Sequence, residues 1–375
     1  MSTTSQLRHT PFHSFHTGHG AKLVNYTGWE MPLHYGSIID EHVQTRTSGG
    51  MFDVSHMGRL RFKGRDACRM MDRCCSRRID GMKSGQVRYG LICNEHGGCR
   101  DDVLIYCIGQ SEYLMVCNAA NREKLLGHFE DIRGDLVYKM KDETESTAMV
   151  AIQGPKVMEL ISQFSSEIPA MKRYRFVTKS VLIAKILVSR TGYTGEDGVE
   201  AILPKAIAAK MVGMMLGNVD AADTPVKPCG LGARDSLRLE AGMCLYGHEI
   251  TEDIDPLTAR LDFAVKLDKG SGQCTAERFL GQDALQAIVD AGGPPRLLTG
   301  LILNGRRAAR QGHAVMQDGV EVGTVTSGCL SPTLDTSIAM AIIDRNAREV
   351  GTTLSINLGR AAVDATVCEL PFLKK

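Results

Sequence analysis

The change of pattern at Gly292-Gly-Pro-Pro295 constrains the fold more than any other feature of the sequence. Before this break, β-branched and apolar runs alternate with helical patterns, whereas after it only short strand-like runs separated by turn residues follow. Glycine and proline in such a cluster interrupt regular elements and mark linkers. We therefore expect an α+β arrangement before the break and a small all-β barrel or sandwich after it. A chain of 375 residues also exceeds one ordinary core, so two or three domains are expected.

The α+β part is expected to combine antiparallel strands with connecting helices. Ser37 is a suitable N-cap for a helix over 37–47, and Gly49-Gly50 ends that helix. Further helices are expected at 66–75, 120–132, 204–216 and 230–241, and short helices are expected to begin at Thr10-Pro11 and Gly154-Pro155. Strands are expected at 54–62, 87–93, 102–108, 112–118 and 148–153, twice within 176–189, and after the break at 297–303, 320–326, 337–343, 353–357 and 361–368.

Composition excludes several classes of partner. The 44 basic and 43 acidic residues nearly cancel, so no nucleic-acid partner is expected. No apolar run reaches membrane-spanning length, and no membrane association is expected. The 12 cysteines form no C-x-x-C pair, which argues against a zinc or thioredoxin-like site and for reduced thiols. We expect a cytoplasmic protein, or a mitochondrial matrix protein if a transit peptide has been removed.

Four histidines recur near the N-terminus, at His9, His13, His16 and His19. A metal site is conceivable at this spacing, but the segment itself supplies no cysteine or carboxylate. The pattern therefore favours a surface face of a short helix, and no metal ion is predicted.

A glycine-rich acidic loop joins two β-branched runs at Arg190-Thr-Gly-Tyr-Thr-Gly-Glu-Asp-Gly-Val-Glu200. Its three glycines permit tight bends and close approach to a ligand. Tyr193 offers an aromatic face, and Glu196, Asp197 and Glu200 offer carboxylates. Two interpretations remain open: a lip for a flat ligand with N–H donors along one edge, or a hairpin loop with solvated charges.

Two adjacent aspartates, Asp101 and Asp102, begin an expected strand. Neighbouring side chains of a strand point to opposite faces, so only one of these carboxylates can face a given cleft. Glycosidase-like chemistry with two acids is therefore disfavoured. A single carboxylate can orient an amine or accept a proton, although a turn-stabilising role is the simpler interpretation. Phosphate-loop, dinucleotide, acyl-transfer and zinc-protease motifs are absent from the sequence.

The expected helix at 230–241 carries charges on an apolar face. At 100° per residue, Arg234, Asp235 and Arg238 fall inside the arc of the leucines and alanines. Ser236 and Glu240 are expected to point away from that arc. The buried charges indicate either an internal Arg–Asp network or an arginine that binds a ligand carboxylate.

Taken together, these segments resemble the aminomethyltransferase family of the glycine cleavage system, the T-proteins. The resemblance runs from end to end in family order, through the following stretches: 20–33, 50–58, 94–102, 118–122, 153–155, 190–198, 230–242, 245–248 and 323–333. It implies a three-domain α+β cloverleaf around a central folate channel, with an all-β C-terminal domain of barrel or jelly-roll type. The implied domains are a folate-binding domain at 1–57 and 145–260, an α+β domain at 58–144 that carries the catalytic aspartate, and a C-terminal domain at 261–375.

The resemblance also implies a reaction. An aminomethyl-derived one-carbon unit passes from the dihydrolipoyl arm of the H-protein to tetrahydrofolate, and the products are ammonia, 5,10-methylenetetrahydrofolate and the reduced arm. Two alternatives remain: a related tetrahydrofolate-dependent demethylase with a small N-methyl or S-methyl donor, and a non-enzymatic folate-binding relative of the tRNA-maturation type.

Residue by residue, Asp102 matches the family's key carboxylate near the reacting folate nitrogens, and Glu200 matches the acid that binds the pterin. Arg234 matches an arginine near the folate tail. Two departures stand out: Phe263 occupies a position where the family usually has tryptophan, beside the folate tail, and Val199 replaces a usual phenylalanine. The remaining matches line the pocket: Met57, Tyr89, Leu104, Asn118 and Tyr193.

Overall fold

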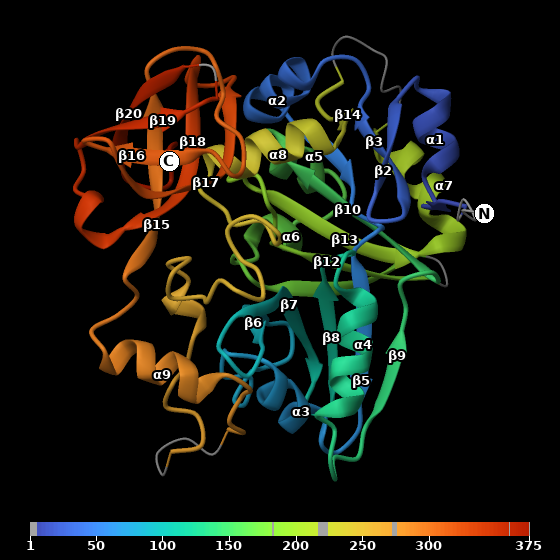
Figure 1. The fold of residues 1–375 in the computed structure, drawn as a ribbon. Coiled ribbons are helices and arrows are strands. Elements are labelled where there is room, and N and C mark those ends of the chain that lie inside the picture. The colour runs from blue at the N-terminus through green and yellow to red at the C-terminus, as the bar shows by residue number, and fades with distance from the viewer. Residues whose placement is uncertain (1–5, 182–183, 217–223, 272–275, 360, 375) are drawn as a thin grey trace. The chain divides into compact units, whose positions relative to one another are not determined.

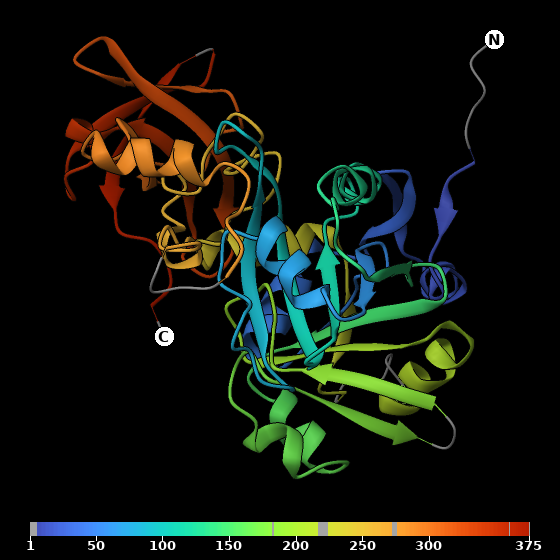
Figure 2. The same cartoon turned by 90° about the horizontal axis from the view of Figure 1, so that it is seen from below.

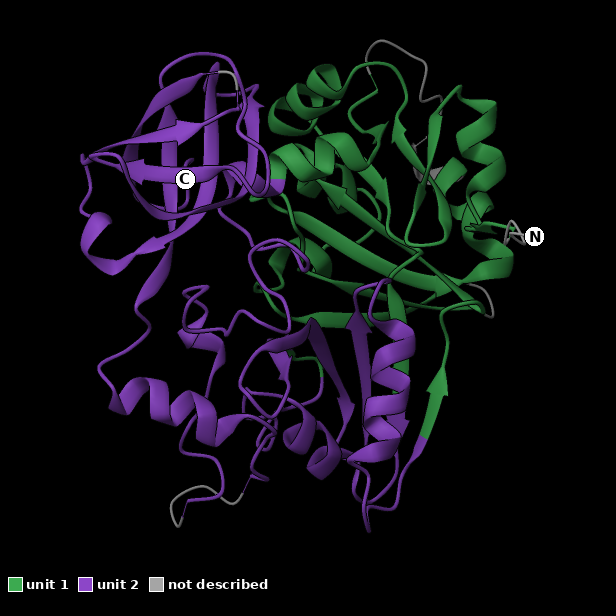
Figure 3. Cartoon of the chain, viewed as in Figure 1, with its two compact units in different colours: residues 1–61, 85–87, 140–237 green, residues 62–84, 88–139, 238–375 purple. Residues whose placement is uncertain are grey.

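The chain forms two compact units (Figures 1 and 3). The structure is a computed structural model, and it describes residues 6–181, 184–216, 224–271, 276–359 and 361–374. Unit 1 comprises residues 1–61, 85–87 and 140–237, and unit 2 comprises residues 62–84, 88–139 and 238–375. The chain therefore passes between the units several times, and neither unit is a single continuous segment.

A six-stranded mixed sheet forms the centre of unit 1, in the order β11-β12-β13-β10-β4-β14. Its neighbours are antiparallel except for β14, which is parallel to β4. Apolar side chains of the sheet, such as Val150 and Val199, pack with helix residues such as Val157 and Val212 into one core. The strands are β4 (Gly50–Asp53), β10 (Thr147–Gln153), β11 (Phe176–Val181), β12 (Ala184–Ser189), β13 (Gly198–Pro204) and β14 (Lys227–Cys229), and the helices are α2 (Ile38–Thr47), α5 (Val157–Ser162), α6 (Glu167–Ala170), α7 (Lys205–Leu216) and α8 (Leu231–Glu240).

A small N-terminal sheet completes unit 1. Strand β1 (Arg8–His9) runs parallel to β3 (Trp29–His34), and β2 (Lys22–Tyr26) pairs antiparallel with β3 on its other side. The short helix α1 (His13–Gly18) lies between β1 and β2 in the sequence.

Unit 2 joins a sheet to a closed barrel. The sheet has the order β6-β7-β8-β5-β9, and the boundary between the units runs through β5 and β9. The barrel has the order β15-β18-β17-β16-β19-β20 (orange to red in Figure 2). The elements are β5 (Gly58–Lys63), α3 (Ala67–Cys74), β6 (Val87–Cys93), β7 (Cys99–Gly109), β8 (Glu112–Cys117), α4 (Arg122–Asp131), β9 (Lys139–Asp142), η1 (Asp262–Ala264), α9 (Gln282–Asp290), β15 (Arg296–Leu303), β16 (Ala314–Gln317), β17 (Val320–Ser331), β18 (Thr336–Asp344), η2 (Arg345–Ala347), β19 (Thr353–Asn357) and β20 (Ala362–Cys368).

A shared core holds the barrel of unit 2 to its sheet. Leu91 of β6 and Cys99 of β7 belong to the same buried cluster as Leu285 of α9, Leu298 of β15 and Met340 of β18. A second cluster fills the barrel itself, with members such as Leu301, Val315 and Ile356. The sequence break at 292–295 therefore separates two types of secondary structure, while the core continues across it.

Most expected elements are confirmed to within a few residues, and the all-β segment is a barrel rather than a sandwich. Ser37 caps α2 by accepting a hydrogen bond from the backbone N–H of Asp40. The helix expected from Thr10-Pro11 begins at His13, and the Thr10 hydroxyl accepts from the backbone N–H of Phe12 while it donates to Asp53. No pattern in the sequence predicted the strands β1, β2, β3, β9, β14 and β16 or the helix α6, which are short or lack clear periodicity.

The strand expected at 54–62 is interrupted, and a buried arginine explains why. Residues 54–57 leave the sheet between β4 and β5, and the guanidinium of Arg59 donates to the carbonyls of Ser55 and Met57 at 3.0 and 2.5 Å. Arg59 is fully buried and also donates to the Thr147 hydroxyl at 2.7 Å. In a sheet, backbone N–H groups of the neighbouring strand donate to such carbonyls. Here the Arg59 side chain donates to them instead.

The substitution Arg59→Met is expected to destabilise the fold by about 3 kcal/mol or more, because several buried carbonyls lose their donor. The matched control is Arg61→Met. Arg61 forms a partly exposed ion pair with Glu143, and its loss is expected to cost about 1 kcal/mol or less. Urea denaturation measures the free energy of unfolding of both variants. Equal losses of stability in the two variants would contradict the role of Arg59.

Candidate active site

The two adjacent aspartates of β7 lie on opposite faces, as predicted. Burial alternates along the first part of the strand: Asp101 is buried and Asp102 is half-buried. Leu104, two residues further on, is also half-buried and shares the face of Asp102. Only Asp102 is therefore available to a ligand on the open face.

One asparagine nevertheless connects both carboxylates. The side-chain nitrogen of Asn118, just after β8, donates to Asp101 at 2.8 Å and to Asp102 at 2.7 Å. Asp101 also accepts from the backbone N–H of Asn118 at 3.0 Å and from the side chain of Asn121 at 2.6 Å. Asp101 thus anchors the asparagine that orients Asp102. Strand periodicity predicts that only one of Asp101 and Asp102 faces a given cleft, and it gives no sign of this link.

Aromatic side chains border Asp102. Tyr89 of β6 donates a hydrogen bond to the Asp102 carboxylate. The Tyr89 ring also stacks on Phe263 of η1, with ring centroids 6.0 Å apart and planes 23° apart. The side chain of Phe263 is 56% exposed, which is unusual for a large apolar residue. The predicted residues Tyr89, Asp102, Leu104, Asn118 and Phe263 all belong to unit 2.

Burial changes the acidity of these carboxyl groups. Burial raises the pKa of Asp102, and the hydrogen bonds from Asn118 and Tyr89 partly oppose this shift. Burial together with the neighbouring charge of Asp102 also raises the pKa of Asp101. A carboxylate with a raised pKa is a better proton acceptor and binds a developing cation more strongly. This group of residues in unit 2 therefore suits chemistry at an amine.

Glu200 is the buried carboxylate of unit 1. It lies in β13, opposite Ser189 of β12 and Ala151 of β10. Only 5% of the residue is exposed, and the Thr191 hydroxyl donates to its Oε2 at 2.5 Å. Burial raises the pKa of Glu200, whereas the Thr191 hydrogen bond and the positive charge of Arg234 act in the opposite direction.

The other carboxylates of the glycine-rich loop are not available to a ligand. Arg190 binds Asp197 through two hydrogen bonds of 2.7 and 2.8 Å, and Arg46 binds Glu196 at 2.8 Å. The idea of an acidic lip is therefore wrong for Glu196 and Asp197, whose charges fix the loop. Gly192 is required, since a Cβ there would lie 1.8 Å from the Gln153 side chain. Of the three acids, Glu200 remains as the ligand candidate.

The arginine of α8 has an incomplete set of partners. The Arg234 guanidinium stacks over the Tyr193 ring, 4.9 Å from its centroid. Its buried Nη1 atom has no hydrogen-bond partner among the residues that the structure describes. A buried guanidinium N–H without an acceptor is costly, so this atom is suited to an acceptor from a ligand.

The expected faces of α8 need correction. Asp235 is exposed rather than buried, while Ser236 and Glu240 are buried rather than exposed. Tertiary hydrogen bonds decide these positions: Ser236 pairs with the His42 ring at 2.7 Å, and Glu240 accepts from Thr333 at 2.8 Å. Helical periodicity cannot predict that a polar side chain is buried because it finds a hydrogen-bond partner in another part of the chain.

Met57 is half-buried at the end of the turn that follows β4. Asp53 holds this turn by accepting from the backbone N–H of Ser55 at 2.8 Å. The adjacent His56 is buried, and its Nδ1 has no partner among the described residues. Burial lowers the pKa of His56 to about 4, with Arg234 and Arg59 contributing. The sequence analysis passed over this neutral imidazole.

The nine predicted residues therefore form two groups. Unit 1 holds Met57, Tyr193, Glu200 and Arg234, and unit 2 holds Asp102 with its four neighbours. A hollow in unit 1, lined by Arg8, Trp29 and Lys205 among others, contains none of them. None of the described helices combines the length and the hydrophobicity that spanning a membrane requires.

The α+β N-terminal part and the closed C-terminal barrel each match a known family model. The GCVT N-terminal domain matches residues 12–269, and the glycine cleavage T-protein C-terminal barrel domain matches residues 296–374. The chain belongs to the glycine cleavage T-protein (GCVT) family.

Curated relatives and a solved structure agree with this assignment. The aminomethyltransferase of Rubrobacter xylanophilus is 42% identical over 98% of this chain and 95% of the relative. That of Cutibacterium acnes is 38% identical over 98% and 99% of the two chains. The crystal structure of glycine cleavage system aminomethyltransferase T from Bartonella henselae has a TM-score of 0.89 at 30% identity, with 98% of each chain covered.

The substitution Asn118→Ala is expected to raise the pKa of Asp102 further, because the ionised form loses its amide donor. The control is Asn121→Ala, which removes a donor from Asp101 alone. That change makes Asp101 easier to neutralise, so the pKa of Asp102 is expected to stay the same or fall. Carbon-13 NMR titration of the aspartate carboxyl groups measures both shifts, and a falling Asp102 pKa in Asn118→Ala would contradict the proposed link.

Proposed function

We propose that this protein transfers a one-carbon unit from the S-aminomethyl-dihydrolipoyl arm of the H-protein to tetrahydrofolate. The bond from the methylene carbon to sulfur breaks, the amine leaves as ammonia, and the carbon becomes bonded to two folate nitrogens. The arm is released as dihydrolipoyl H-protein. Family membership and the environment of Asp102 support this proposal. The lipoylated H-protein is the proposed partner.

Asp102 is the proposed catalytic residue. Its carboxylate is half-buried, has a raised pKa, and receives hydrogen bonds from the neutral side chains of Asn118 and Tyr89. A negative charge in such a place stabilises the positive charge that develops on nitrogen as ammonia leaves. It also orients the attacking folate nitrogen and accepts its proton. Catalysis then rests on positioning and electrostatics rather than on a protein nucleophile.

The unit 1 group has the proposed role of binding the folate. Tetrahydrofolate presents a pterin edge with adjacent N–H donors and a tail with carboxylates. Glu200 is a buried acceptor suited to the pterin edge. The unpartnered Nη1 of Arg234 is suited to an anionic tail, and Tyr193 holds the guanidinium plane. Met57 supplies an apolar contact in this group, and Leu104 with the Tyr89–Phe263 pair has the same proposed role in unit 2.

We also place the protein in a reducing compartment, the cytoplasm in a bacterium. Every cysteine that the structure describes is free, and most of them are buried. Burial raises the pKa of Cys74, Cys75 and Cys229, which keeps these thiols protonated and unreactive. They serve as small apolar core residues.

The variant Asp102→Asn is expected to lower kcat by about two orders of magnitude or more while tetrahydrofolate still binds. The assay is ammonia release from lipoylated, aminomethyl-loaded H-protein, with and without tetrahydrofolate. Near-normal turnover in the variant would remove Asp102 from its role. Absence of turnover by the unaltered protein with this donor, but turnover with a small N-methyl or S-methyl donor, would favour the demethylase alternative.

The variant Asp102→Asn is expected to lose activity without losing stability. Because burial raises the pKa of Asp102, its ionised form costs folding free energy at pH values above the ordinary range of an aspartate. Asp102→Asn is therefore expected to be as stable as the unaltered protein, or more so, at neutral pH. Urea denaturation at pH 7 measures this difference. A variant that is both inactive and strongly destabilised would indicate a structural role instead.

Phe263→Trp is expected to tighten tetrahydrofolate binding by about twofold to tenfold, because a larger ring stacks over more area and adds an N–H donor. kcat is expected to change little. Calorimetric titration measures the Kd, and Phe164→Trp, at a 65% exposed position of unit 1, is the matched control. Equal affinity in Phe263→Trp and the control would exclude Phe263 from the folate site.

A further inference from the structure

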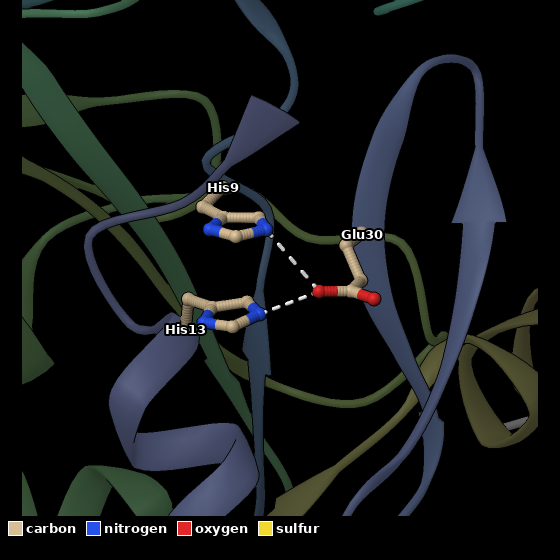
Figure 4. A group of neighbouring side chains, drawn as sticks. All are labelled: His9, His13 and Glu30. Carbon is tan, nitrogen blue, oxygen red and sulfur yellow. Dashed lines mark hydrogen bonds and ion pairs between the residues drawn. The ribbon is translucent and has the colours of Figure 1, made fainter. Parts of the chain in front are cut away.

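Three side chains near the N-terminus converge on one point, and none of them is a residue assigned to folate chemistry. His9 and His13 both direct their Nε2 atoms at one oxygen of Glu30 (Figure 4). The distances to Oε2 are 3.3 Å from His9 and 2.6 Å from His13. All three ligand atoms lie within 4.8 Å of one another.

The backbone of unit 1 determines this convergence. In the parallel pair of β1 and β3, His9 stands directly opposite Glu30. His13 begins α1 only four residues after His9, which brings its ring onto the His9 ring. The two rings stack with centroids 3.8 Å apart and planes 8° apart. Both imidazoles therefore present the same edge to Glu30.

We propose that His9, His13 and Glu30 form a binding site for one divalent transition-metal ion, of which Zn²⁺ is the representative case. Two imidazole nitrogens and one carboxylate oxygen are an established donor set for zinc sites that keep a position for water. Zinc lies about 2.0–2.2 Å from such ligands, so tetrahedral ligand atoms are about 3.3 Å apart. The His9–Glu30 separation of 3.3 Å matches that value, whereas the His13–Glu30 separation of 2.6 Å is shorter and would have to widen around an ion.

The ligands are accessible yet held on ordered elements. The side chains of His9, Glu30 and His13 are 47%, 31% and 22% exposed, so an ion can enter and retain a water ligand. Helix α1 is anchored to the core by His16, which bonds Asp53 at 2.9 Å and Tyr35 at 2.7 Å. Because the two stacked rings lie in nearly parallel planes, one imidazole must rotate on its side chain before both nitrogens can point at one ion.

Ligand type determines the class of metal. Imidazole nitrogens favour zinc, copper, nickel and cobalt, whereas magnesium and calcium prefer oxygen ligands. The sequence analysis rejected a metal because the histidine segment lacks a carboxylate. That carboxylate comes instead from Glu30, which belongs to a different strand. A bound ion would cross-link β1, α1 and β3.

The test uses the full-length chain without a polyhistidine tag, stripped of metal and titrated with Zn²⁺ against a chromophoric chelator. One equivalent is expected to bind, and Co²⁺ is expected to give the intense visible absorption of tetrahedral coordination. Glu30→Gln and His13→Gln are each expected to weaken binding by more than about tenfold. His19→Gln is the matched control, since His19 bonds the Phe15 carbonyl and not Glu30.

Thermal unfolding supplies a second readout that does not depend on activity. Zn²⁺ is expected to raise the Tm of the unaltered protein and of His19→Gln, and to leave the Tm of Glu30→Gln unchanged. Glu30→Gln keeps the shape of the side chain, so loss of folding is not expected to obscure the result. The proposal is overturned if no equivalent of Zn²⁺ or Co²⁺ binds, or if Glu30→Gln and His13→Gln bind as tightly as the control.

Discussion

The pairing of buried charges is the constraint on which both units depend. Glu196 is matched by Arg46 in unit 1, and Asp72 is matched by Lys269 and Glu249 by Arg238 in unit 2. Removing one partner of such a pair leaves a charge without compensation in a medium of low polarity, which is strongly destabilising. The elements that carry these pairs are therefore fixed relative to their neighbours. Charged groups with incomplete compensation stand out against this background.

Three of the predicted site residues are groups of this kind. The hydrogen bonds described for Asp102 and Glu200 come from the neutral side chains of Asn118, Tyr89 and Thr191. Arg234 retains a buried N–H without an acceptor. Each of these groups costs folding free energy in the absence of a ligand, and each can recover it from a ligand of complementary charge. Sites built for catalysis commonly contain this kind of unfavourable local electrostatics.

The sequence was informative about the fold wherever local signals decide the structure. The Ser37 cap, strand β6 and the change to an all-β segment after Pro295 follow from capping, alternation and turn residues. Sequence patterns failed to predict the structure where the hydrogen bonds of one buried side chain determine the path of the backbone. The interruption after β4 depends on Arg59, whose guanidinium reaches the carbonyls of residues 55 and 57. No spacing rule within 54–62 contains that information.

The same difference between local sequence patterns and tertiary contacts explains which site residues the sequence could identify. Strand alternation correctly separated Asp101 from Asp102, yet it could not reveal that Asn118 binds both, because the asparagine arrives through the pairing of β7 with β8. The positions of Asp102, Glu200 and Arg234 were recognised from family resemblance rather than from periodicity. Where no family pattern was used, as for His9 and Glu30, only the register of β1 on β3 brings the ligand atoms together. Clusters of this kind follow from strand register, which a single sequence specifies only through the whole fold.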